Sequence, residues 1–337
     1  MRKLLITCML TISSIASLQA QAAEVNIYSF RQPFLIEPIL KEFTAQTGIE
    51  TNIIFSKKGL IQRLKREGEL SPADIVLTSN FAKMLQIKEQ NLSQPYTLSG
   101  TLTENIPAQF RDSENHWLAL TQRVRNIYSS KERSGDQSAI RYEDLAKPEF
   151  KGRICTRSGK HPYNLGLIAS MIAHNGEAET EQWLSDVKSN LARKPQGNDR
   201  AQVKAIKEGL CDVSLGNSYY LGKMLQDPKQ IEWANSVNLN FPNQNDRGSH
   251  VNVSGAILAK YAPNKSSAQK LIEFLTSKQA QSLYAELNME YPVMPTAKVS
   301  DLVSSWGTFK ADPLPLEDVA KLQKQALKLV DKVRFDL

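Results

Sequence analysis

Residues 24–77 read EVNIYSFRQPFLIEPILKEFTAQTGIETNIIFSKKGLIQRLKREGELSPADIVL, and their hydrophobic pattern decides the fold class. Short apolar or alternating runs predict strands, and amphipathic stretches between them predict helices. The expected elements are a strand at 24–28, a helix at 34–47, a strand at 50–55, a helix at 60–67 and a strand at 74–77. This alternation is typical of a parallel sheet with crossover helices, so the sequence predicts an α/β fold.

The same alternation restarts after the segment RVRNIY at 123–128. The elements expected there are a strand at 153–156, helices at 164–174, 180–191 and 201–209, and a strand at 211–215. A later strand at 251–258 is expected to return to the first sheet, and a helix at 316–333 ends the chain. A chain that passes from the first α/β unit to the second and then returns to the first predicts two α/β lobes joined by a hinge.

We therefore expect two parallel or mixed sheets with flanking helices. The predicted first lobe comprises residues 23–123 and 248–297, and the predicted second lobe comprises residues 124–247 and 298–337. A mature chain of about 315 residues exceeds the usual size of a single hydrophobic core, which favours this division.

Residues 1–22 have the layout of a secretory signal peptide. Arg2 and Lys3 precede an apolar run, and the small residues Ala20-Gln21-Ala22 form the expected cleavage site. Cleavage lowers the formal net charge from +7 to +5. The rest of the sequence has no apolar run of the roughly 18 to 20 residues that a membrane span needs, so we expect a soluble protein outside the cytoplasm. Its Lys and Arg residues do not cluster with aromatic residues, which argues against nucleic-acid binding.

Two cysteines, Cys155 and Cys211, remain after removal of the segment that contains Cys8. Because an exported compartment is oxidising, a disulfide between them is the simplest interpretation. The alternative is a thiolate metal site, which would need more ligands than two cysteines and four scattered histidines readily provide.

Tyrosines follow two of the predicted strands in the second lobe. Ligands of open α/β sheets bind beyond the carboxyl ends of strands, and Tyr219 and Tyr220 lie just after the strand at 211–215. Tyr163 follows the strand at 153–156. Fe³⁺ prefers anionic oxygen ligands, so three phenolates would suit it and would also cancel its charge. The alternative is that these rings simply pack at the starts of helices.

Six motifs extend this pattern over essentially the whole mature chain. They are YSFRQPFLIEP (28–38), SPADIVLT (71–78), RVRNIYS (123–129), KHPYN (160–164), GNSYYLGKM (216–224) and HVNVSGAILAK (250–260). In these motifs the sequence resembles the ferric-iron-binding proteins of bacterial uptake transporters, which have a transferrin-like two-lobe fold. The resemblance implies that Tyr163, Tyr219 and Tyr220 are iron ligands. It also implies a monomer in the periplasm that delivers iron to an inner-membrane ABC permease.

The sequence departs from the family pattern in the first loop. Some members carry a His-Tyr pair there, whereas this chain has Gln32-Pro33. Two or three coordination positions are then left for water or for a small anion such as carbonate or bicarbonate. Arg31 and Arg123 are the candidate anion-binding residues because a guanidinium can form a bidentate fork with a planar oxyanion. Gln32 is a further candidate, and Arg125 is expected near the same cleft.

The same residues also bear on other functions. A different small solute, such as an oxyanion or a polyamine, stays open as the ligand of this fold. A hydrolase is disfavoured because the sequence has neither a G-x-S-x-G nor an H-E-x-x-H motif. The roles of His161 and His250 stay open among iron ligand, partner of a ligand, and ordinary loop residue.

Overall fold

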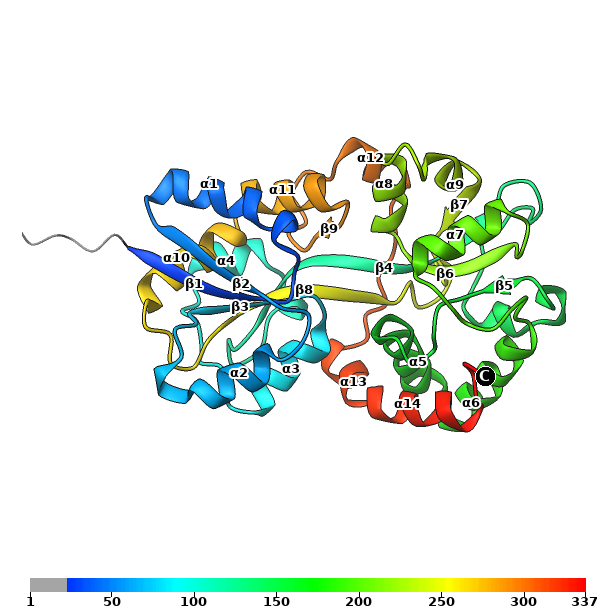
Figure 1. Ribbon diagram of the computed structural model, residues 1–337, viewed down its shortest axis with the longest axis horizontal. Helices are drawn as coiled ribbons and strands as arrows, with labels where there is room; N and C mark the ends of the chain where they lie inside the picture. The colour runs from blue at the N-terminus through cyan, green and yellow to red at the C-terminus, as the bar shows by residue number, and fades with distance from the viewer. Residues whose placement is uncertain (1–22) are drawn as a thin grey trace, which may run out of the picture.

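The computed structural model describes residues 23–337, so the predicted signal peptide at 1–22 lies outside the described residues. Its first elements are three parallel strands, with β1 (Glu24–Ser29) between β2 (Glu50–Phe55) and β3 (Ile75–Thr78). The connecting helices α1 (Glu37–Thr47) and α2 (Leu60–Glu67) lie on opposite sides of these strands (Figure 1). The predicted strand and helix alternation is confirmed here.

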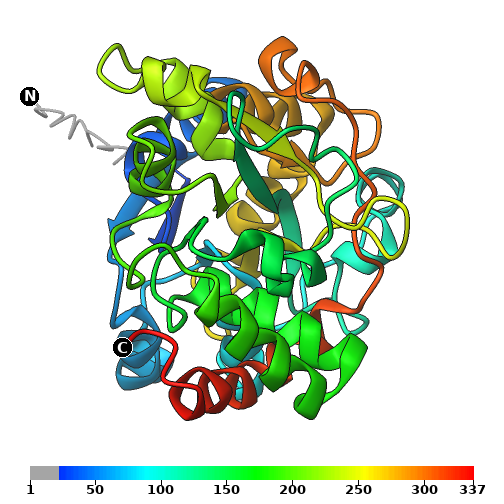
Figure 2. The same ribbon diagram turned by 90° about the vertical axis from the view of Figure 1, so that its right-hand side faces the viewer.

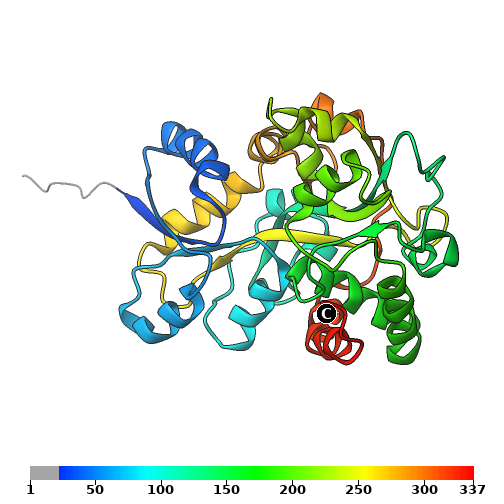
Figure 3. The ribbon, with the colours of Figure 1, turned by 45° about the vertical axis from the view of Figure 1, so that its right-hand side comes forward.

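Two long antiparallel strands join this unit to the rest of the molecule (Figures 1 and 3). They are β4 (Leu118–Ser130), which has 13 residues, and β8 (Val251–Leu258), which also pairs with β3. The end of β4 pairs with β6 (Val213–Asn217) and with β7 (Val237–Asn240). The short strand β5 (Ile154–Cys155) pairs in parallel with β6. A two-residue strand, β9 (Tyr291–Pro292), pairs with Thr121 and Gln122 in the first part of β4.

The strands therefore form one connected mixed sheet with the order β2-β1-β3-β8-β4-β6-β5. The prediction of two separate sheets is wrong on this point. The reason is that β4 is unbroken, so its first residues pair with β8 and its last residues pair with β6 and β7. We call β2, β1, β3, β8 and the start of β4 the first half of the sheet, and the end of β4 with β6, β5 and β7 the second half.

Helices cover both faces of each half and bury separate hydrophobic clusters. The first half is covered by α1, α10 (Lys265–Leu275) and α11 (Lys278–Asn288) on one face, and by α2 and α3 (Phe81–Glu89) on the other. The second half is covered by α5 (Pro162–Asn175), α6 (Glu177–Ser189) and α14 (Gln323–Lys332) on one face, and by α7 (Asp199–Lys207), α8 (Tyr219–Leu225) and α9 (Ile231–Asn235) on the other. Figure 2 shows the second half from its outer end. The lobe boundaries stay a prediction.

The C-terminal segment differs from the single helix predicted at 316–333. Leu322 separates α13 (Leu316–Lys321) from α14. The break lets α13 contact both α3 and α5, whereas α14 packs on α5 and α6. Two further short helices are α4 (Gly100–Asn105) and α12 (Asp301–Ser304). No helix within residues 23–337 is long and apolar enough to cross a membrane.

The predicted disulfide between Cys155 and Cys211 is confirmed. Cys155 ends β5, Cys211 lies two residues before β6, and their Cα atoms are 5.8 Å apart. Both residues are buried in the cluster beneath α7 and α8, and 56 positions separate them in the sequence. The bond therefore fastens the two strands that lead into the tyrosine-bearing loops.

Removal of this disulfide is expected to destabilise the protein by about 3 to 4 kcal/mol, because a closed loop of this length restricts the unfolded chain. The measurement is urea unfolding of a Cys155→Ala/Cys211→Ala variant against the oxidised parent. Reduced parent protein is the matched control, since it loses the bond and keeps both side chains. Equal midpoints for all three samples would contradict the expectation.

Candidate functional site

Two helix starts on the second half of the sheet hold the candidate tyrosines. Tyr163 is the second residue of α5, and Tyr219 and Tyr220 are the first two residues of α8. Before α8, β6 ends in Gly216 and Asn217. An added Cβ on Gly216 would collide with the ring of Tyr128, so only glycine lets the chain pass there. The local sequence thus places α8 directly after the sheet.

The structure brings the three phenols together. The Oη atoms of Tyr163 and Tyr219 are 3.3 Å apart, and the ring centroids of Tyr219 and Tyr220 are 4.2 Å apart. All three side chains are half-buried. Residues 56 positions apart in the sequence therefore present their phenolic oxygens to one point.

The electrostatics of this cluster disfavour a bare phenolate. Burial raises the pKa of Tyr219 well above its usual value, and the neighbouring phenols of Tyr163 and Tyr220 raise it further, against the opposing effect of Arg123. Burial and Tyr163 likewise raise the pKa of Tyr220 to about 12. Tyr219 and Tyr220 therefore favour the protonated phenol unless a cation compensates the charge of their phenolates.

Three arginines lie around the ring of Tyr163. The guanidinium carbons of Arg157, Arg123 and Arg125 are 5.3, 5.9 and 6.0 Å from its centroid. Arg123 is buried, and its Nη2 donates to the carbonyl oxygens of Ser79 and of Val253, the latter at 3.1 Å. Of the three, only Arg123 forms no ion pair within residues 23–337, so its guanidinium has the uncompensated charge that a bound anion would need.

Arg31 is also buried near this cluster, but its charge has a partner. Its two terminal nitrogens donate to the two carboxylate oxygens of Glu290 at 3.2 and 3.1 Å. Burial opposes the charged form of Arg31, yet Glu290 and, to a smaller extent, Tyr219 raise its pKa overall. Glu290 could not be predicted from the sequence. The candidate residues were those that follow a predicted strand, whereas Glu290 lies just before the short strand β9.

The remaining candidates occupy distinct positions. Gln32 is half-buried beside Arg31 at the start of a 3₁₀ turn over Pro33–Leu35, and its side chain has no hydrogen bond to any residue in 23–337. His161 caps α5, where its Nδ1 accepts the backbone N–H of Tyr163 at 3.2 Å. Burial and Arg157 lower the pKa of His161 to about 4. His250 is buried against Gly166 of α5, and burial lowers its pKa to about 4 as well.

A buried carboxylate that sequence analysis missed connects the tyrosine-bearing elements. Asp199, at the start of α7, accepts hydrogen bonds from Arg125 at 2.8 Å and from Arg157 at 3.1 Å. The same carboxylate accepts the backbone N–H of Asn217 at 3.0 Å, two residues before Tyr219. Arg125 also donates to Asn164, the neighbour of Tyr163, at 2.6 Å. An acidic residue in the first turn of a helix is common, so the sequence carried no signal of this role.

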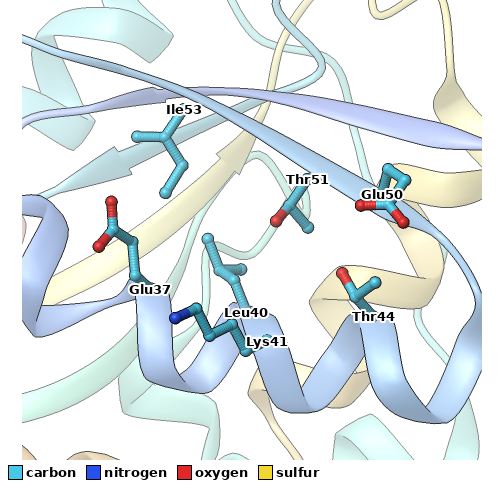
Figure 4. A pocket seen from close by; sticks show the side chains of 7 residues that line it. All are labelled: Glu37, Leu40, Lys41, Thr44, Glu50, Thr51 and Ile53. Atoms are coloured by element: carbon cyan, nitrogen blue, oxygen red, sulfur yellow. The ribbon is translucent and has the colours of Figure 1, made fainter.

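A separate hollow lies on the outer edge of the first half of the sheet. Side chains of α1 and of the edge strand β2 line this space of about 430 Å³, which Figure 4 shows. Its lining contains no tyrosine. Within the part of the chain that the structure describes, no group of three or more His, Cys, Asp and Glu residues is arranged to hold a metal ion. The phenol cluster is thus the arrangement with the clearest chemical function.

Comparison with known proteins defines the family of this chain. Residues 69–311 match the bacterial extracellular solute-binding protein family. The chain is 39% identical to iron uptake protein A1 of Synechocystis over 94% of its own length and 89% of that protein. It is 56% identical to the ferric iron-binding protein A of Mannheimia haemolytica, crystallised in an open conformation, with a TM-score of 0.89 over 94% of this chain and 100% of that one. The chain belongs to the bacterial ferric-iron-binding periplasmic proteins.

Membership of this ferric-iron-binding family confirms the resemblance found in the sequence motifs. The family comprises solute-binding proteins and not enzymes, so the prediction of a non-enzymatic protein is confirmed as well. A Trichodesmium protein solved in complex with iron and citrate ligands is 38% identical, with a TM-score of 0.88 over 93% of this chain and 100% of that one.

Proposed function

We propose that this protein captures ferric iron through the phenolate oxygens of Tyr163, Tyr219 and Tyr220. The observation that supports this most directly is the convergence of the three phenols, two of them 3.3 Å apart, at the starts of two helices. Fe³⁺ is a hard cation that favours such oxygen ligands, and three phenolates would balance its charge. Because iron must displace the phenolic protons of Tyr219 and Tyr220, whose pKa values are raised, the affinity for iron falls as the pH falls.

The biological setting follows from the relatives. The Synechocystis relative is an iron uptake protein, and the Mannheimia relative is a ferric iron-binding protein. We propose that this chain is exported to the periplasm by residues 1–22 and acts as a monomer. It binds iron between a lobe of residues 23–123 and 248–297 and a lobe of residues 124–247 and 298–337. Closure of the lobes then presents the loaded protein to an inner-membrane ABC permease.

A small anion completes the coordination of iron in this proposal. Arg123, Arg31 and Gln32 are the proposed anion-binding residues, with carbonate or bicarbonate as the anion. The iron and citrate complex of the Trichodesmium relative supports a carboxylate as an alternative. Gln32 is better supported than Arg31 in this role. The side chain of Gln32 has no hydrogen-bond partner within residues 23–337, whereas both terminal nitrogens of Arg31 already contact Glu290.

The test of the iron proposal is a visible absorption spectrum with metal analysis of the purified protein. Ferric iron on phenolates is expected to produce a charge-transfer band that disappears in acid or with a strong chelator. A non-absorbing oxyanion or a polyamine would leave the protein colourless. Stoichiometric iron without such a band would contradict phenolate coordination, and absence of iron binding would contradict the function itself.

The anion proposal makes its own prediction. Bicarbonate is expected to strengthen ferric binding, and Gln32→Ala is expected to reduce this gain by about tenfold because one polar contact to the anion is lost. Iron affinity is measured by competition with a chelator, with and without bicarbonate. Gln46→Ala, a substitution on the exposed surface of α1, is the matched control. If bicarbonate leaves the affinity of the parent protein unchanged, Arg31, Arg123 and Gln32 do not bind this anion.

A further inference from the structure

A second cavity lies where the C-terminal part of the chain crosses between the halves of the sheet. Its volume is about 610 Å³, within the range of small-molecule sites. Residues 109–117, before β4, form one wall. Residues 311–318, which run from the loop after α12 into the first turn of α13, form the other. Figure 1 shows this second segment as the orange to red chain that descends beside β4. We call this space the crossover cavity.

The first wall offers hydrogen-bond donors that have no partner. Trp117 is 3% exposed, yet its indole Nε1 has no hydrogen-bond acceptor within the described residues. Arg111 makes no ion pair with any residue in 23–337, and its buried Nε is likewise without an acceptor. The adjacent carboxylate of Asp112 does not compensate Arg111, because Asp112 binds Lys88 at 2.6 Å. Buried donors of this kind are costly unless an acceptor satisfies them.

The second wall is largely apolar, and most of its carboxylates are already engaged. Leu314, Leu316 and two prolines line it, facing Phe110 and Trp117. Asp312 binds His174 at 2.8 Å and accepts the backbone N–H of Leu314 at 3.1 Å. Asp318 is exposed and lies 3.8 Å from Lys321. The third carboxylate, Glu317, is half-buried and has no ion pair within residues 23–337. The two buried donors without an acceptor, the indole N–H of Trp117 and the Nε of Arg111, both belong to the first wall.

We propose that the crossover cavity is a second binding site, which takes an amphipathic carboxylate. The carboxylate accepts from Arg111 and from the indole N–H of Trp117, and the apolar part of the ligand packs on Phe110, Leu314 and Leu316. A guanidinium suits a carboxylate because the two groups pair through parallel hydrogen bonds. This site is distinct from the phenol cluster, since none of the three tyrosines lines it.

Occupancy of the crossover cavity is coupled to the iron site, an inference that rests on the proposed function. Leu314 packs against the core of the second half, whereas Leu316 packs against the core of the first half. Leu316 begins α13, which contacts α3 in the first half and α5 in the second half. Because α5 carries Tyr163, a ligand that braces residues 311–318 changes the free energy of moving the halves relative to each other.

The binding test uses phenylacetate as the probe and iron-free protein. Nuclear magnetic resonance titration is expected to show saturable binding with a Kd on the order of 1 mM. Arg111→Gln and Trp117→Phe are each expected to weaken it by about tenfold or more. Arg66→Gln, on the exposed face of α2 and outside the cavity lining, is the matched control. Benzylamine, of similar shape and opposite charge, is not expected to bind.

Three results would overturn the site: no saturable phenylacetate binding below about 10 mM, equal binding by the Arg111→Gln variant, or preference for benzylamine. Coupling is tested by measuring ferric affinity with and without saturating phenylacetate. A shift of about threefold or more in either direction, matched by the same factor in the phenylacetate Kd of iron-loaded protein, is expected. Unchanged ferric affinity would overturn the coupling. If the protein bound no iron, the proposed function would fail, while the phenylacetate result would still decide the cavity.

Discussion

Replacing Tyr219 and Tyr220 together with phenylalanine is expected to reduce ferric affinity by more than about a thousandfold. Each phenol supplies an anionic oxygen to Fe³⁺. Structural zinc sites of four ligands bind with about 10 to 16 kcal/mol, and on that scale two ligands account for several kcal/mol. Phenylalanine keeps the contact between the rings, which are 4.2 Å apart at their centroids. The free energy of unfolding is therefore expected to change by only about 1 kcal/mol, the value of the lost hydrogen bond to Tyr163.

Chelator competition and urea unfolding of the same preparations measure these two effects. Tyr261→Phe is the matched control, because Tyr261 is 39% exposed and lies outside the cluster. The control is expected to keep both the affinity and the visible band of the parent. Retention of ferric affinity by the double variant would refute the tyrosine site, whereas loss of affinity together with unfolding would show that the rings serve the fold.

The substitution Asp199→Asn is expected to have the largest effect on stability. Asp199 is completely buried and is the shared partner of Arg125 and Arg157. Breaking a buried ion pair leaves a desolvated cation without compensation and costs about 3 to 5 kcal/mol. The loop before Tyr219 is also affected, because Asp199 accepts the N–H of Asn217. We therefore expect weaker ferric binding in the fraction that stays folded.

Thermal unfolding and ferric titration of the Asp199→Asn variant test this expectation. Asp301→Asn is the matched control, because it makes the same chemical change at an ion pair whose carboxylate is 95% exposed. Surface pairs contribute little, so the control is expected to change the free energy of unfolding by less than about 1 kcal/mol. If the two variants have the same stability, the network around Asp199 does not organise the site.

Much of the fold could be predicted because the signals are local. The strands β1, β2 and β8 and the helix α2 occupy nearly the positions that the hydrophobic pattern predicts. Alternation in β2, a short apolar run in β8 and helical periodicity in α2 are all properties of consecutive residues. The tyrosines were identified for a similar reason, as loops after strands converge at one edge of a sheet. The disulfide could be predicted because only two cysteines lie outside the predicted signal peptide and an exported compartment is oxidising.

The partners of the charged residues could not be predicted. Arg31 was expected to face an anion, yet it contacts Glu290, which is 259 positions away in the sequence. Arg125 was expected near the cleft from the sequence, but in the structure it donates hydrogen bonds to Asp199 and Asn164 beneath the tyrosine-bearing loops. No periodic pattern relates such residues, because their proximity depends on the path of the whole chain. The same limit explains the single connected sheet, which depends on β4 continuing from one half into the other.

The sequence by itself determined the alternation of strands and helices, the disulfide pair and the positions of three tyrosines at helix starts. Only the tertiary structure decided that the phenols of Tyr163 and Tyr219 meet at 3.3 Å and that Arg31 is paired with Glu290. It also decided where residues 311–318 cross and leave a cavity. The physical reason is that hydrophobic periodicity acts between neighbours in the sequence, whereas ion pairs, buried donors and cavities depend on residues that packing alone brings together.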